Sequence, residues 1–171
     1  MLIVVEGCDR TGKTSLCRRL VTELGGFYVH FGPPTLDDPV EEYLAPLARY
    51  VPGHDQHLIV DRHYLGETVW PSFFKRKTKM TDSTQAQIEG FLERRGACCV
   101  LAIREPRSLN QACVDGDEPT GDKAWLVQVV FQSHAAHSRL PWIEYEHGKP
   151  GDYEHVVMNA REREAFAARS F

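Results

Sequence analysis

The chain has 171 residues, with 20 Lys or Arg against 24 Asp or Glu, so its formal net charge is -4. A negative chain has no overall attraction for nucleic acid or anionic lipid, and any anion must be held by a local site. At 42% hydrophobic and 26% charged residues, the composition excludes disordered, collagen-like and membrane-protein classes. A chain of this length forms one sizeable core, and we expect a single domain over residues 1–171.

The first apolar run, residues 2–5, is too short for a signal peptide and far below the roughly 18 residues of a membrane span. It indicates a buried strand, and the sequence predicts a cytoplasmic protein with no membrane partner. The five cysteines are odd in number and scattered, a pattern that predicts reduced thiols and no zinc site.

Short apolar runs alternate along the chain with longer segments of helical spacing. Runs of strand length occupy residues 2–5, 27–31, 58–60, 98–103 and 155–158. Helical spacing connects them, continues to about Leu140 and closes the chain from about Arg161. Alternating strands and helices predict an α/β fold with a five-stranded parallel sheet covered by helices on both faces.

A glycine-rich motif, GCDRTGKT at residues 7–14, follows the first predicted strand directly and matches GxxxxGK[ST]. Such loops turn backbone N–H groups and a helix N-terminus toward a phosphate, while the lysine supplies charge and the last hydroxyl binds Mg²⁺. The motif predicts ATP binding with Mg²⁺. The predicted ATP-binding residues are Gly7, Asp9, Arg10, Thr11, Gly12, Lys13, Thr14 and Ser15.

A second candidate site segment, Asp61-Arg62-His63, lies at the end of the third predicted strand. Ligands gather at the carboxyl ends of strands in an open α/β sheet, so Asp61 is expected to share Mg²⁺ with Thr14. The alternative is that Asp61 caps the next helix and Arg62 pairs with a surface acid. The sequence contains no NKxD segment of the kind that reads guanine in GTPases.

Residues Val5–Ser15, together with the Asp61-Arg62-His63 segment, resemble the thymidylate kinases, especially members with an arginine inside the phosphate loop. The resemblance covers the first part of the chain and implies a three-layer α/β/α P-loop kinase fold. It implies that Asp9 approaches the acceptor sugar, that Arg10 stabilises the phosphoryl group in flight, and that Arg62 binds the acceptor phosphate. Lys13, Arg10 and Asp61 would then be the catalytic residues.

Three features depart from the family pattern. The family commonly has an arginine after the second strand, where this chain has Gly32-Pro33-Pro34. Residues 104–122, where a mobile lid is expected, end in an acidic, exposed loop, so Arg104 and Arg107 are the lid candidates. The chain is also short, like the thymidylate-kinase-like proteins of bacteriophages, which would place it in a host cytoplasm; the resemblance further implies a homodimer.

An acceptor site is expected along the helix that follows Arg62. His63, Glu67 and Trp70 could contact the acceptor, with Asp9 and Arg62, and Phe73 or Phe74 could add to an aromatic wall. The alternative for the aromatic residues is that they belong to the core, as aromatic residues at helical spacing usually do.

A basic run lies just beyond this helix, at Lys75, Arg76, Lys77 and Lys79. Such runs are usually solvated surface, but beside an acceptor pocket this one could bind DNA, in which case activity on DNA would fall with rising salt.

The sequence therefore predicts an ATP- and Mg²⁺-dependent phosphotransferase that converts a deoxynucleoside monophosphate, dTMP-like, to the diphosphate. The alternatives are a kinase acting on a modified base such as 5-hydroxymethyluracil in DNA, a deoxynucleoside kinase, and a non-enzymatic nucleotide-dependent switch or binding module.

Overall fold

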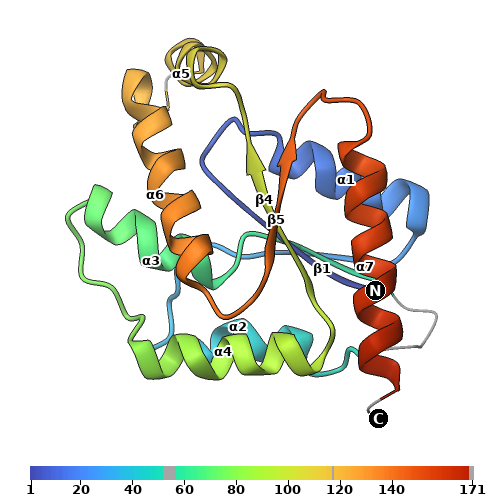
Figure 1. Cartoon of the computed structure of the whole chain (residues 1–171). Helices are drawn as coiled ribbons and strands as arrows, with labels where there is room; N and C mark the ends of the chain where they lie inside the picture. The colour runs from blue at the N-terminus through green and yellow to red at the C-terminus, as the bar shows by residue number, and fades with distance from the viewer. Residues whose placement is uncertain (52–56, 117, 170–171) are drawn as a thin grey trace.

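The structure is a computed structural model that describes residues 1–51, 57–116 and 118–169 (Figure 1). Its centre is a five-stranded parallel sheet, as the sequence predicted, and the strand order is β2-β3-β1-β4-β5. The strands are β1 (Leu2–Glu6), β2 (Phe27–His30), β3 (Leu58–Asp61), β4 (Cys98–Ile103) and β5 (Trp142–Glu146). The α-helices are α1 (Lys13–Leu24), α2 (Pro39–Leu44), α3 (Tyr64–Phe73), α4 (Asp82–Arg94), α5 (Pro106–Asp115), α6 (Ala124–His137) and α7 (Asp152–Ala168), and short 3₁₀ helices occupy Ala45–Leu47 and Gly121–Lys123.

Helices cover both faces of the sheet, because its central strands are apolar on both sides. In β1, Leu2 and Val4 pack into one buried cluster, while Ile3 and Val5 pack into another. Figure 1 shows α1 and α7 on one face and α2, α3, α4 and α6 on the other. The three-layer α/β/α architecture is confirmed. The edge strand β2 differs from the central strands, because Phe27 and Tyr28 remain 64% and 44% exposed.

The prediction of the fifth strand was wrong in position. Residues 155–158 lie inside α7, where Val156 and Ala160 are one turn apart and both face the core. The fifth strand is Trp142–Glu146, which pairs with β4 from Cys99 to Ile103. Tyr145 is its one buried side chain and two of its five residues are glutamates, so it lacks the continuous apolar run that marked the central strands.

The segment 104–122, predicted to be a lid ending in an exposed loop, is largely regular structure. Glu105 caps α5 by accepting N–H bonds from Arg107 at 3.1 Å and Ser108 at 2.7 Å. Thr120 is buried, and a 3₁₀ turn follows it. All five cysteines are buried and none forms a disulfide. Each helix in the described ranges is too short or too polar to cross a membrane.

Candidate active site

The phosphate loop lies between β1 and α1, in the strand–loop–helix context that the motif requires. Its backbone is left-handed at Arg10 (φ 61°) and Gly12 (φ 90°), and Gly7 has a φ of 140°. A Cβ at Gly7 would lie 2.3 Å from the carbonyl oxygen of Ala102, and one at Gly12 would lie 2.8 Å from the His147 side chain. Only glycine avoids these collisions, so the loop can keep its N–H groups turned toward an anion at the start of α1.

Lys13, the first residue of α1, is 5% exposed. Its Nζ donates to the carbonyl oxygen of Cys8, and the Thr11 hydroxyl donates to the same oxygen at 2.8 Å. Burial lowers the pKa of Lys13, and the nearby Asp9 carboxylate opposes that shift. A bound phosphate would give the ammonium group a charged partner in place of a neutral carbonyl.

Thr14 and Asp61 meet beside the loop, as the sequence predicted for a metal site. The hydroxyls of Thr14 and Tyr28 donate to Asp61 Oδ2 at 2.9 and 2.8 Å, and His30 Nδ1 lies 3.5 Å from the same oxygen. Asp61 is fully buried, and its Oδ1 has no hydrogen-bond partner among the described residues. A hydroxyl beside a buried carboxylate with one unpartnered oxygen fits the oxygen ligands that Mg²⁺ takes.

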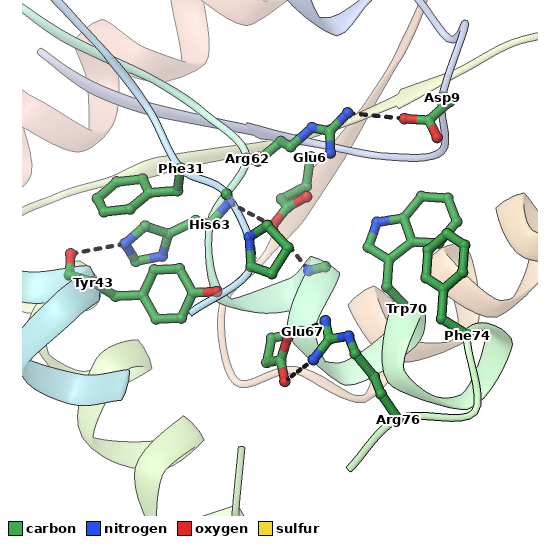
Figure 2. Close-up of a pocket in the computed structure, with 13 residues that line it drawn as sticks. Glu6, Asp9, Phe31, Tyr43, Arg62, His63, Glu67, Trp70, Phe74 and Arg76 are labelled. Carbon is green, nitrogen blue, oxygen red and sulfur yellow. Dashed lines mark hydrogen bonds and ion pairs between the residues drawn. The ribbon is translucent and has the colours of Figure 1, made fainter. Parts of the chain in front are cut away.

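Arg62 extends from the turn between β3 and α3 to the phosphate loop (Figure 2). Its Nη2 donates to Asp9 Oδ1 at 2.9 Å, and its backbone N–H donates to the Val5 carbonyl oxygen at 2.8 Å. Its φ of 66° turns the chain sharply at this point. The acid that pairs with Arg62 is therefore in the phosphate loop.

Arg10 is held by the segment that follows α5. Its Nε donates to Glu118 Oε1 at 2.7 Å and its Nη2 to the Gly116 carbonyl oxygen at 3.4 Å. Of the two lid candidates, Arg104 donates to the Arg10 carbonyl oxygen at 3.2 Å, while Arg107 is exposed. To contact a transferred phosphoryl group, the Arg10 guanidinium must exchange Glu118 for it.

A cavity of about 140 Å³ opens beside Arg62 (Figure 2). It is lined by residues of β1, α2 and α3, of the phosphate loop, of the turn between β3 and α3, and of the segments after β2 and α3. Aromatic side chains form much of its wall: Phe31, Tyr43, Trp70 and Phe74. The structure brings all the predicted acceptor-binding residues to this cavity, namely Asp9, Arg62, His63, Glu67 and Trp70.

His63 lines the cavity with a ring that is fixed by its neighbours. Its Nε2 lies 3.1 Å from the Tyr43 carbonyl oxygen, and its ring is edge-on to Phe31 with centroids 5.1 Å apart. Burial lowers the pKa of His63 to about 4, so the ring is neutral at neutral pH. Nε2 then carries the proton, and Nδ1 is an acceptor without a partner in the described part of the chain.

Trp70 belongs both to the core and to the cavity, so the two interpretations of its role are compatible. Its ring stacks on Phe74 at a centroid distance of 5.6 Å and meets Phe131 edge-on at 5.7 Å. Phe73 packs against Trp70 but does not line the cavity.

Glu67 and Arg76 form an ion pair in the cavity wall. The guanidinium donates to both carboxylate oxygens, at 2.8 and 2.5 Å, and Glu67 is 2% exposed. Arg76 was grouped with the basic run, but its side chain is turned inward to the cavity.

The lysines of the basic run also differ from one another. Lys79 donates to the carbonyl oxygens of Thr35 at 3.1 Å and Leu36 at 2.7 Å. Lys75 and Lys77 are exposed. The proposed DNA contact therefore depends on these two side chains.

Sequence reasoning missed Glu6, the last residue of β1. It is 1% exposed, and its Oε1 accepts N–H bonds from His63 at 2.6 Å and Gly66 at 3.0 Å. Burial raises the pKa of Glu6 to about 7 against the opposing effect of these bonds, Lys13 and Arg62. The available signal was an acidic residue that ends an otherwise apolar strand just before the phosphate loop.

A second depression, of about 570 Å³, lies between α1 and the loop that joins β5 to α7. Ser15, Arg19, His147 and Tyr153 line it, and the Arg19 guanidinium lies 3.5 Å from the centre of the Tyr153 ring. Because Ser15 follows the phosphate loop directly, this depression is continuous in sequence with the predicted donor site.

No protein-family model matches the sequence, and a search of curated proteins finds no match. Solved structures do resemble the fold. The YorR protein of Bacillus subtilis, in complex with phosphorylated GDP, is similar over 97% of this chain and 98% of its own, with 19% identity and a TM-score of 0.74. A putative polyphosphate kinase 2 from Pseudomonas aeruginosa is similar over 99% of this chain, with 16% identity and a TM-score of 0.66, and the chain spans 43% of its length. Polyphosphate kinase 2 from Arthrobacter aurescens matches over 96% of this chain and 68% of its own, with 14% identity and a TM-score of 0.62. These similarities agree with the three-layer α/β/α fold predicted from the sequence.

Proposed function

We propose that the protein transfers a phosphoryl group from ATP, with Mg²⁺, to an acceptor bound in the cavity beside Arg62. The observation that carries this proposal is the arrangement at the phosphate loop. Among the described residues, the buried Lys13 ammonium donates to one carbonyl oxygen, and Thr14 contacts an Asp61 carboxylate whose second oxygen has no hydrogen-bond partner. These are the groups that a triphosphate and its metal ion require.

Each side chain around the loop has a role in the proposed reaction. Lys13 would bind the terminal phosphates, and Arg10, once released from Glu118, would balance the charge that develops on the transferred group. Mg²⁺, held by Thr14 and Asp61, supplies further positive charge to the phosphates. The donor base would lie in the depression that Arg19 lines, where the YorR complex with phosphorylated GDP supports nucleotide binding to this fold.

The acceptor is proposed to contain a deoxynucleoside, because the aromatic cavity wall, with Trp70 and Phe74, suits the stacking of a base. The resemblance to thymidylate kinases favours a monophosphate held by Arg62. A second candidate is a hydroxyl acceptor, either a free deoxynucleoside or a hydroxymethylated base in DNA. It is favoured by one observation, that both cavity arginines, Arg62 and Arg76, already pair with carboxylates.

The test is ADP release from ATP and Mg²⁺ with a panel of deoxynucleosides, their monophosphates, and DNA with or without 5-hydroxymethyluracil. Lys13→Ala should lower turnover about 10³-fold, whereas Lys123→Ala, which removes an exposed lysine outside the basic run, should not. Stoichiometric ATP binding with no transfer to any acceptor would instead favour a nucleotide-dependent switch.

A further inference from the structure

Both arginines that line the acceptor cavity already pair with carboxylates. Arg62 pairs with Asp9, and Arg76 pairs with Glu67 through two bonds. Glu6 adds a third carboxylate to the same lining. A dianionic acceptor would bring further negative charge into a lining that already holds the carboxylates of Asp9, Glu6 and Glu67, whereas a neutral acceptor would add none.

Glu6 has one oxygen that is fixed and one that is available. Oε1 accepts the two backbone N–H groups of His63 and Gly66, which holds the carboxylate at the start of α3. Oε2 makes no hydrogen bond to any of the described residues, and Glu6 lines the cavity (Figure 2). The hydrogen bonds to the start of α3 therefore explain the position of Oε1 but give no role to Oε2.

Gly66 keeps the approach to Oε2 open. It lies within α3 and its φ is not positive, so its backbone conformation does not demand glycine. A Cβ at this position would lie 3.5 Å from Glu6 Oε2 and 3.4 Å from Trp70 Cδ1. Glycine inside a helix lowers the stability of the helix relative to alanine. Here it leaves the space between Glu6 Oε2 and the Trp70 indole open to the cavity.

The groups around Glu6 leave it able to take up a proton near neutral pH. Lys13 and Arg62 favour its ionised form, and Asp9, Tyr43, His63 and the Cys99 thiol face it from the other elements. Burial outweighs the two cations and raises the pKa of Glu6 to about 7, the range suited to general base catalysis.

We infer that the acceptor is an alcohol, a deoxynucleoside or hydroxymethylated base, and that Glu6 Oε2 takes the proton from its reacting hydroxyl. The hydroxyl oxygen forms a bond to the γ-phosphorus, the bond from that phosphorus to the β–γ bridging oxygen breaks, and ADP leaves with the electron pair. This inference rests on the proposed function, because it requires ATP as the donor.

The decisive variant is Glu6→Gln, whose amide oxygen can still accept the two N–H bonds but whose side chain takes up no proton. The panel is thymidine, 5-hydroxymethyldeoxyuridine, DNA containing 5-hydroxymethyluracil, and the four deoxynucleoside monophosphates. We expect turnover on an alcohol, and a loss in kcat of about 10²- to 10⁴-fold in Glu6→Gln with the KM for ATP unchanged. Glu162→Gln, the same change at an exposed position of α7, is the matched control.

A second variant keeps the inference testable if Glu6→Gln does not fold. Gly66→Ala leaves the carboxylate in place but covers Oε2, and we expect kcat/KM for the alcohol to fall at least tenfold. Gly90→Ala, in α4 and outside the cavity, is its control.

Two results would overturn the inference in distinguishable ways. Turnover on a monophosphate with equal kcat in Glu6→Gln and wild type would remove the role of Glu6 and leave the proposed function standing. No transfer to any acceptor would overturn the inference and the proposed function together.

Discussion

The phosphate loop and the acceptor cavity adjoin each other at the carboxyl end of the sheet and share Asp9, but they are built in different ways. The loop is one contiguous segment whose shape rests on backbone conformation, with Gly7 and Gly12 at positions where a Cβ would collide. The cavity is assembled from residues of β1, α2, α3 and four connecting segments, among them the phosphate loop. Under the proposed function, the phosphate loop would bind the donor triphosphate, and the side chains of the cavity would select the acceptor.

The largest effect is expected from Lys13→Ala, on the donor side. Removing the buried ammonium group takes away charge that the transferred phosphoryl group needs, so kcat should fall about 10³-fold with any acceptor. The free energy of unfolding should not decrease, because burial of this ammonium group is unfavourable. ADP release and urea unfolding measure both quantities, and a variant with normal kcat would contradict the assignment of the donor site.

A smaller effect, confined to the acceptor side, is expected from Arg62→Ala. Arg62 orients the Asp9 carboxylate in the cavity wall through a charged hydrogen bond of 2.9 Å, so its loss should raise the acceptor KM about 10- to 100-fold while the KM for ATP stays within about twofold. Arg18→Ala, at an exposed position of α1, is the control. Steady-state kinetics with each substrate varied in turn measure both KM values. Equal changes in the two would show that the donor and acceptor sites do not bind their substrates independently.

The third prediction concerns stability rather than turnover. The pKa of Glu6 rises from 4.5 to about 7 on folding, so the folded state loses stability as the pH rises from about 4.5 to 7. Glu6→Gln removes this loss and should raise the free energy of unfolding by about 3 kcal/mol at pH 8 but only about 1 kcal/mol at pH 5.

The pKa of His63 shifts in the opposite direction, from 6.5 to about 4, so its contribution to stability is lost as the pH falls through that range. Comparing Glu6→Gln with wild type at each pH removes this common background. Urea unfolding across the range measures the difference, and a difference that does not grow with pH would show that Glu6 is not buried in an apolar setting.

The contrast between a contiguous loop and a cavity built from distant segments also explains which site residues the sequence could predict. The phosphate loop and Asp61 were predictable because each lies within a short contiguous pattern, a glycine motif and the end of an apolar strand. Glu6 and the inward turn of Arg76 were not, because their roles depend on contacts between distant segments. The fifth strand was misplaced for a related reason: an edge strand is apolar on one side only, and the α7 segment 155–158 imitated a buried run.

The smallest effect is expected from replacing Lys75 and Lys77 together with alanine. Both are exposed, so turnover on a free nucleoside should be unchanged. With a single-stranded DNA acceptor, two lost phosphate contacts should lower the salt slope of log K by about 1.4. Arg76→Ala should behave differently, because it leaves the buried Glu67 unpaired and should impair both acceptors. If the lysine variant lost turnover equally with the nucleoside and with DNA, these lysines would be needed to maintain the cavity. If the salt slope with DNA were unchanged, Lys75 and Lys77 would not bind DNA.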